Sequence, residues 1–153
     1  MDLHPDFKEL LAECVAAKVE FAIVGGYAVG FHARPRATKD LDLLVLGVPE
    51  NLARLAAALA AFGAPPNVVA AATTAGVDDV IYFGVAPLRV DIMTHADGID
   101  TRAALERAVY ADLGTVAVPI LGLADLIANK RASGRKQDLA DLEILEQPRT
   151  PTE

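Results

Sequence analysis

Residues 24–46 read VGGYAVGFHARPRATKDLDLLVL, and this stretch sets the question that the rest of the chain has to answer. Two glycines follow an apolar segment, and Asp40 and Asp42 interrupt what otherwise reads as a buried strand. Burying a carboxylate is costly unless another group compensates its charge. Either these aspartates face water, or a cation binds them.

The segments around this stretch predict a mixed β-sheet with flanking helices, an α/β (α+β) fold. Apolar spacing of i, i+3, i+4 and i+7 indicates helices, and short apolar runs bounded by Gly or Pro indicate strands. The expected helices are 5–18, 27–33, 49–62, 101–110, 123–132 and 136–146. The expected strands are 20–24, 41–46, 80–83, 88–93 and 115–121, with 80–83 and 88–93 forming a hairpin.

Length and composition predict one domain, residues 1–146, followed by a flexible C-terminal tail, residues 147–153. The chain has 153 residues, of which 53% are hydrophobic and 23% charged. Its net charge of −7 argues against a general nucleic-acid coat protein, because non-specific binding needs many Lys and Arg side chains. A single cysteine, Cys14, reads as a core residue of the first helix and suits a reducing cytoplasm. No apolar run approaches the length needed to cross a bilayer, so a cytoplasmic protein without membrane contact is expected.

A dinucleotide-binding Rossmann unit is the first functional interpretation of the glycines, and the spacing argues against it. Gly25, Gly26 and Gly30 form GGxxxG instead of GxGxxG. In a Rossmann unit the acidic residue ends the second strand, whereas Asp40 and Asp42 begin theirs.

Metal binding by paired carboxylates fits better. Alternate residues of a strand point to the same side, about 6.6 Å apart, so Asp40 and Asp42 should project together while Leu41 enters the core. Asp91 lies in a similar setting, within the run LRVDIM. The alternative is that all three are exposed strand or turn residues, but three acids that each have β-forming neighbours favour a common site.

Basic and polar residues offer further candidate contacts. Arg36, Thr38 and Lys39 precede the acids and either contact phosphates or the acceptor, or form a solvated loop. Near the C-terminus, Lys130 and its basic neighbours either neutralise a triphosphate or lie on exposed helix faces. These neighbours are Arg131, Arg135 and Lys136. Asp138 and Asp141 either pair with Arg135 or cap the last helix, and no histidine has metal-ligand spacing.

These residues resemble the signature of the DNA polymerase β-like nucleotidyltransferase superfamily over about residues 20–95. The signature is a strand, then Gly-Gly or Gly-Ser on a short helix, then Asp-x-Asp on the next strand, with a third acid on a later strand. Here it stands as Gly25-Gly26, Asp40-Leu41-Asp42 and Asp91. The segment LADLIANKRASGRKQDLADLEIL also resembles the end of small bacterial members in toxin–antitoxin and abortive-infection systems.

The resemblance implies an NTP substrate and two Mg²⁺ ions, with Mn²⁺ as a substitute. Gly25 and Gly26 would hold the β- and γ-phosphates through their backbone N–H groups, with Arg36, Thr38 and Lys130 as further contacts. Asp40 and Asp42 would bind the ion that carries the triphosphate. Asp42 and Asp91 would bind a second ion that activates an acceptor hydroxyl, and pyrophosphate would leave.

The acceptor is left open by the resemblance. Small members of this superfamily often need a dimer or a partner protein to complete the acceptor site, and the acceptor could be a tRNA end, a partner protein or a small molecule. The Gly-Gly pair also lacks the serine hydroxyl of Gly-Ser members. The competing hypotheses are a non-catalytic antitoxin or interaction module, and an NTP sensor that binds without transferring.

Overall fold

The structure is a computed structural model that describes residues 2–34, 38–84 and 88–147. Within these ranges the fold is mixed α/β, as predicted: six strands form one mixed sheet in the order β3-β4-β2-β1-β6-β5. The strands are β1 (Phe21–Val24), β2 (Asp40–Val45), β3 (Val80–Phe83), β4 (Arg89–Met93), β5 (Val109–Asp112) and β6 (Ala117–Ile120). Arg36 and most of the predicted tail lie outside the described residues.

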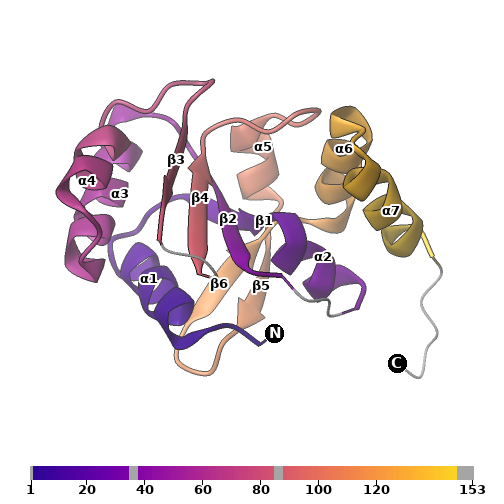
Figure 1. Cartoon of the computed structure of the whole chain (residues 1–153), viewed down its shortest axis with the longest axis horizontal. Helices are drawn as coiled ribbons and strands as arrows, with labels where there is room; N and C mark the ends of the chain where they lie inside the picture. The colour runs from indigo at the N-terminus through magenta and orange to yellow at the C-terminus, as the bar shows by residue number, and fades with distance from the viewer. Residues whose placement is uncertain (1, 35–37, 85–87, 148–153) are drawn as a thin grey trace.

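Helices cover both faces of the sheet (Figure 1). On one face α1 packs on α3, α3 packs on α4, and α4 contacts β3. On the other, α2 contacts α6 and α7, which form a pair at the C-terminal end. The helices are α1 (Pro5–Ala16), α2 (Gly25–His32), α3 (Pro49–Phe62), α4 (Pro66–Ala72), α5 (Thr101–Glu106), α6 (Leu123–Ser133) and α7 (Lys136–Leu145). No described helix is both long and apolar enough to span a bilayer.

Local signals account for most element boundaries. The helix predicted at 49–62 begins with Pro49 in its first turn and ends at Gly63, whose φ of 94° is left-handed. The buried amide of Asn51 then ties this helix to the sheet: it donates to the carbonyls of Glu20 and Leu46 and accepts from the Glu20 N–H. Cys14 is buried, as predicted, and burial raises the pKa of its thiol to about 12.

Two elements were not expected, and several boundaries were wrong. The helix predicted at 101–110 ends at Glu106, because Val109 and Tyr110 pair with β6 as the edge strand β5. Helix α4 was not predicted, although Pro66 stands in its first turn. The short helix predicted from Tyr27 begins at Gly25. The hairpin prediction is confirmed by the antiparallel pairing of β3 and β4.

The register of the central strands decides which side chains meet. β1 pairs with β2 antiparallel and β2 with β4 parallel. A continuous row therefore crosses four strands: Val24 lies opposite Asp42, Asp42 opposite Asp91, and Asp91 opposite Tyr82. Residues directly opposite each other in neighbouring strands point to the same face. Two of the three predicted acids are thus neighbours on one face of the sheet.

Candidate functional site

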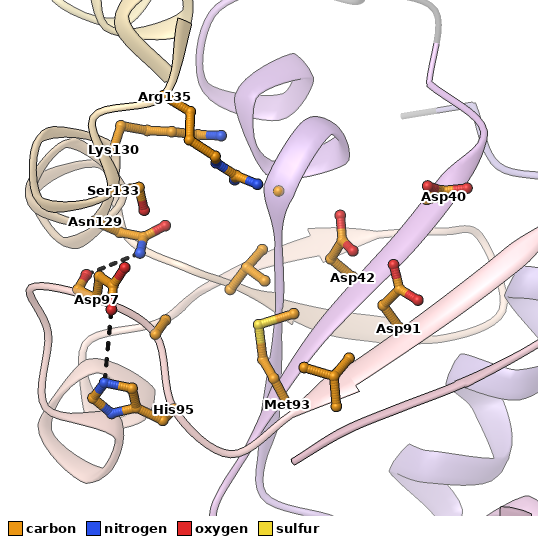
Figure 2. Close-up of a pocket in the computed structure, with 14 residues that line it drawn as sticks. Asp40, Asp42, Asp91, Met93, His95, Asp97, Asn129, Lys130, Ser133 and Arg135 are labelled. Carbon is orange, nitrogen blue, oxygen red and sulfur yellow. Dashed lines mark hydrogen bonds and ion pairs between the residues drawn. The ribbon is translucent and has the colours of Figure 1, made fainter. Parts of the chain in front are cut away.

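Asp42 and Asp91 form the centre of the site. Both side chains are partly buried, and Figure 2 shows their carboxyl groups side by side on neighbouring strands. The pKa of Asp42 is raised to about 7, first by burial, then by the charges of Asp91 and Asp40 and by a side-chain hydrogen bond with Asp91. The raised pKa means that, near neutral pH, Asp42 is stabilised by a bound proton or by a nearby cation.

Gly25, directly after β1, lies against Asp42. Its φ of 68° is left-handed, and a Cβ placed on it would overlap Asp42 Oδ2 and lie 2.9 Å from Asp42 Cγ. Only glycine lets the start of α2 approach the carboxylate so closely. α2 has no side-chain N-cap bond, so the first-turn N–H groups of Gly25 and Gly26 lack one possible partner. The site thus places helix N–H donors beside the carboxyl pair.

Asp40 is the most exposed of the three acids. It is exposed at the start of β2, and Figure 2 shows its carboxyl group apart from those of Asp42 and Asp91. In register, Asp40 lies opposite Arg89. Among the described residues, no three or more His, Cys, Asp or Glu side chains are grouped closely enough to hold a metal ion as they stand. Convergence of all three acids on metal ions therefore stays a prediction.

Arg89 and Tyr82 both lie beside Asp91, and neither was a predicted site residue. Arg89 precedes Asp91 by two residues on β4, and Tyr82 lies opposite Asp91 on β3, the strand on the side away from Asp42. Arg89 Nε–H donates to Asp91 Oδ1 at 2.8 Å. The Arg89 guanidinium also lies over the Tyr82 ring, 4.6 Å from its centroid. The bond to Asp91 and its negative charge raise the pKa of Arg89, which stays charged. The i, i+2 spacing of Arg89 and Asp91 on a strand was the signal that could have found this contact.

A cationic wall, formed by Lys130 of α6 and by Arg135 at the N-cap of α7, faces the acids. Lys130 and Arg135 both line the cavity, and Figure 2 shows them across it from Asp91. Lys130 is buried, and its Nζ lies 3.1 Å from Asp138 Oδ1 and 3.0 Å from Asp141 Oδ2. Arg135 is exposed, and its Nε–H donates to Asp138 Oδ2 at 2.8 Å.

The interpretation of the basic residues as exposed helix faces holds for some of them and not for others. An exposed helix face is wrong for Lys130, because two buried carboxylates hold it inside the α6–α7 pair. It is right for Arg131 and Lys136, which are exposed. Burial opposes ionisation of Asp138, but hydrogen bonds from Arg135 and Lys130 outweigh it and lower the pKa of the carboxyl.

The acids, Gly25 and the cationic wall line a cavity of about 570 Å³ that is open to solvent. Asn129, Ser133 and Met93 also line the cavity, as Figure 2 shows, and none of them was predicted. His95 also lines the cavity, with its Nε2 3.9 Å from Asp97 Oδ1. Thr38 is not among the lining residues, and its backbone carbonyl accepts a hydrogen bond from the Tyr27 hydroxyl at 3.3 Å.

Comparison with known proteins adds no assignment: no protein-family model and no curated protein matches this chain. The function is therefore inferred from the residues and the geometry of this cavity.

Proposed function

We propose that this protein is a metal-dependent nucleotidyltransferase that moves an NMP from an NTP to an acceptor hydroxyl. The observation that carries the proposal is the contact of three elements at one point: Asp42 and Asp91 in register, with Gly25 of α2 against Asp42. A sheet with a purely structural role gains nothing from two neighbouring carboxyl groups packed against a helix N-terminus that begins with glycine. The cavity above it has room for a nucleotide.

The residues present fit a divalent cation. Asp42 and Asp91 would hold it with Asp40, because carboxylate oxygens are the hard donors that Mg²⁺ and Mn²⁺ prefer, and the raised pKa of Asp42 shows that its charge lacks full compensation. When bound, such ions neutralise phosphate charge and lower the pKa of an attacking hydroxyl.

The chain's own groups would position the NTP. The N–H groups at the start of α2 would receive its phosphates, since a helix N-terminus favours anions. Arg135 and Lys130 would face the same phosphates from across the cavity. Lys130 is buried and paired with Asp138 and Asp141, whereas Arg135 is exposed and paired with Asp138 alone, so Arg135 is the more available cation.

In the transfer step the acceptor oxygen forms a bond to the α-phosphorus. The bond from that phosphorus to the bridging oxygen breaks, and its electron pair leaves with pyrophosphate. The hydroxyl proton passes to the carboxylate of Asp91, which is the group in the row farthest from Gly25 except for Tyr82. Asp91 is the general base in this proposal, the role that the superfamily resemblance implies for the third acid.

The first test is a thermal-shift titration with each of the four NTPs, with and without Mg²⁺. A ligand at a hundred times its Kd adds about 2.7 kcal/mol, which a small domain shows as a shift of several degrees. We expect a Mg²⁺-dependent shift in wild type that is lost in Asp42→Asn and kept in Asp78→Asn, a matched control at an exposed acid. Absence of any shift in folded wild type would contradict the proposal.

Two further measurements separate the competing functions. Single-turnover release of pyrophosphate distinguishes an enzyme from an NTP sensor, which binds without release. Partner binding that is unchanged when divalent ions are chelated would instead favour a non-catalytic interaction module.

A further inference from the structure

The edge strand β3 lacks the charged and proline residues that usually keep a sheet edge from pairing with another chain. β3 reads VIYF, and it stands at one end of the strand order. Among the described residues its only strand partner is β4, and no backbone hydrogen bond joins it to any other described segment. The outer N–H and C=O groups of β3 are therefore available to a further strand.

The surface around β3 is uncharged and partly apolar. Residues 55–77 contain no charged side chain, although charged residues make up 23% of the chain. Val77, Val80 and Tyr82 are 67%, 52% and 62% exposed, and exposed apolar side chains that lie together mark interaction sites. Each copy of the chain has a net charge of −7, so two copies repel each other least where both surfaces are uncharged. This surface is the one on which a second copy meets the smallest repulsion.

β3 is complementary to itself in one antiparallel register. Centred on Ile81, this register places Val80 of each copy opposite Tyr82 of the other, and a twofold axis repeats the pair. An aromatic side chain opposite a β-branched one is a favourable cross-strand pair. A register centred on Tyr82 would instead bring together two rings that each carry the Arg89 guanidinium, so like charges would meet. The register about Ile81 is therefore the favoured one.

Charges beyond the two ends of β3 also favour this register. It carries the acidic pair before Val80, residues 78–79, toward Gly84 of the other copy. Gly84 adjoins Arg89, since a Cβ placed on Gly84 would lie 3.3 Å from Arg89 Cα. The Arg89 side chain is 47% exposed. Two carboxylates of each copy would thus approach a guanidinium of the other.

We propose that the protein forms a homodimer in which β3 pairs with β3 of a second copy, antiparallel and centred on Ile81. The two six-stranded sheets then join into one continuous sheet. A specific dimer removes at least about 1,000 Å² from water, more than one short strand provides, so α4 beside β3 takes part as well (Figure 1). Its exposed residues Asn67, Ala70 and Ala71 are uncharged. The groove of about 460 Å³ between α4 and β3 then faces its counterpart across the axis.

Sedimentation equilibrium of the full chain, over a range of protein concentrations, measures this association. We expect wild type to reach twice the chain mass of 16.1 kDa. Tyr82→Lys should raise the dissociation constant of the dimer by about tenfold or more, because the axis places the new charge in both copies. Tyr110→Lys is the matched control, since Tyr110 is 68% exposed on the opposite edge strand, β5, and it should associate as wild type does.

Three results of this experiment would overturn the dimer. They are a wild type that stays monomeric at every concentration, a Tyr82→Lys protein that associates as tightly as wild type, and equal weakening by Tyr82→Lys and Tyr110→Lys.

Cysteine cross-linking tests the pairing and its register even where a lysine variant fails to fold. Under mild oxidation, a mixture of Val80→Cys and Tyr82→Cys chains should give a disulfide-linked dimer, because opposite residues have Cβ atoms about 4.5–5.5 Å apart. Each variant alone should not cross-link, since like residues are then diagonal neighbours, about 7–8 Å apart. The native Cys14 is buried. A mixture that does not cross-link, or a single variant that cross-links as well as the mixture, would overturn the proposed register.

Discussion

Gly25 and Asp42 are packed so closely that no side chain fits between them: a Cβ on Gly25 would lie 2.9 Å from Asp42 Cγ. The two residues belong to different elements, Gly25 to the start of α2 and Asp42 to β2. Their contact joins the left-handed start of the helix to an acid whose pKa is raised to about 7. A change at either residue should therefore affect the other.

Gly25→Ala should destabilise the protein and abolish its Mg²⁺-dependent NTP shift. The left-handed backbone alone costs about 1–2 kcal/mol for a residue with a Cβ, and displacement of the Asp42 carboxyl adds to that. Urea denaturation measures the loss. Gly63→Ala is the control, because Gly63 is also left-handed, with a φ of 94°, but a Cβ there meets nothing within 4 Å. Equal losses in the two variants would show that the contact with Asp42 is unimportant.

Without divalent ions, Asp42 should make the protein less stable as the pH rises from about 4 to about 7. Its folded pKa of about 7 exceeds the ordinary value of 3.8, so the folded state binds the additional proton in this window. The stabilisation is complete below pH 4 and is lost as the pH passes through 7. Asp42→Asn should lack this slope and be the more stable protein at pH 8.

Thermal denaturation of wild type and Asp42→Asn across this range checks the prediction, and Asp78→Asn controls for loss of an exposed carboxylate. Mg²⁺ should flatten the wild-type curve, because a cation stabilises the ionised pair. Parallel curves for wild type and Asp42→Asn would mean that the pKa of Asp42 is not raised.

Lys130→Met should destabilise the protein by about 3–5 kcal/mol, because it leaves Asp138 and Asp141 buried without their shared cation. Lys136→Met removes an exposed lysine at the start of α7 and should cost little. Chemical denaturation compares the two. A Lys130→Met protein as stable as wild type would show that the buried network contributes little. Arg135→Gln is consequently the better variant for testing phosphate contact without unfolding α6 and α7.

Arg89→Gln should bind divalent cations a few-fold more tightly than wild type. The Arg89 guanidinium donates a hydrogen bond to Asp91 Oδ1 and repels a cation that approaches this oxygen. Its removal therefore leaves the carboxyl pair more available to a metal ion. Isothermal titration with Mn²⁺ measures the change in Kd, with Arg102→Gln on α5 as the control. Weaker Mn²⁺ binding by Arg89→Gln would indicate that Arg89 orients Asp91 for the metal.

Several parts of this arrangement could be predicted from local sequence. Glycines and prolines mark the ends of α3 and α6, and β-forming runs mark β2 and β4. Helix α4 and strand β5 could not be recognised in this way. Each is short, and β5 forms because β6 offers it a partner, which is a tertiary condition.

The sequence by itself determined that three acids lie in or beside strands and that a glycine pair opens the intervening helix, because both features depend on spacing within one segment. Only the tertiary structure decided which side chains meet. The parallel register of β2 and β4 pairs Asp42 with Asp91, leaves Asp40 at the rim and places Tyr82 beside the pair. The packing of α6 on α7 buries Lys130 between two carboxylates. Register and helix packing depend on hydrogen bonds and apolar contacts between distant segments, which no local pattern specifies.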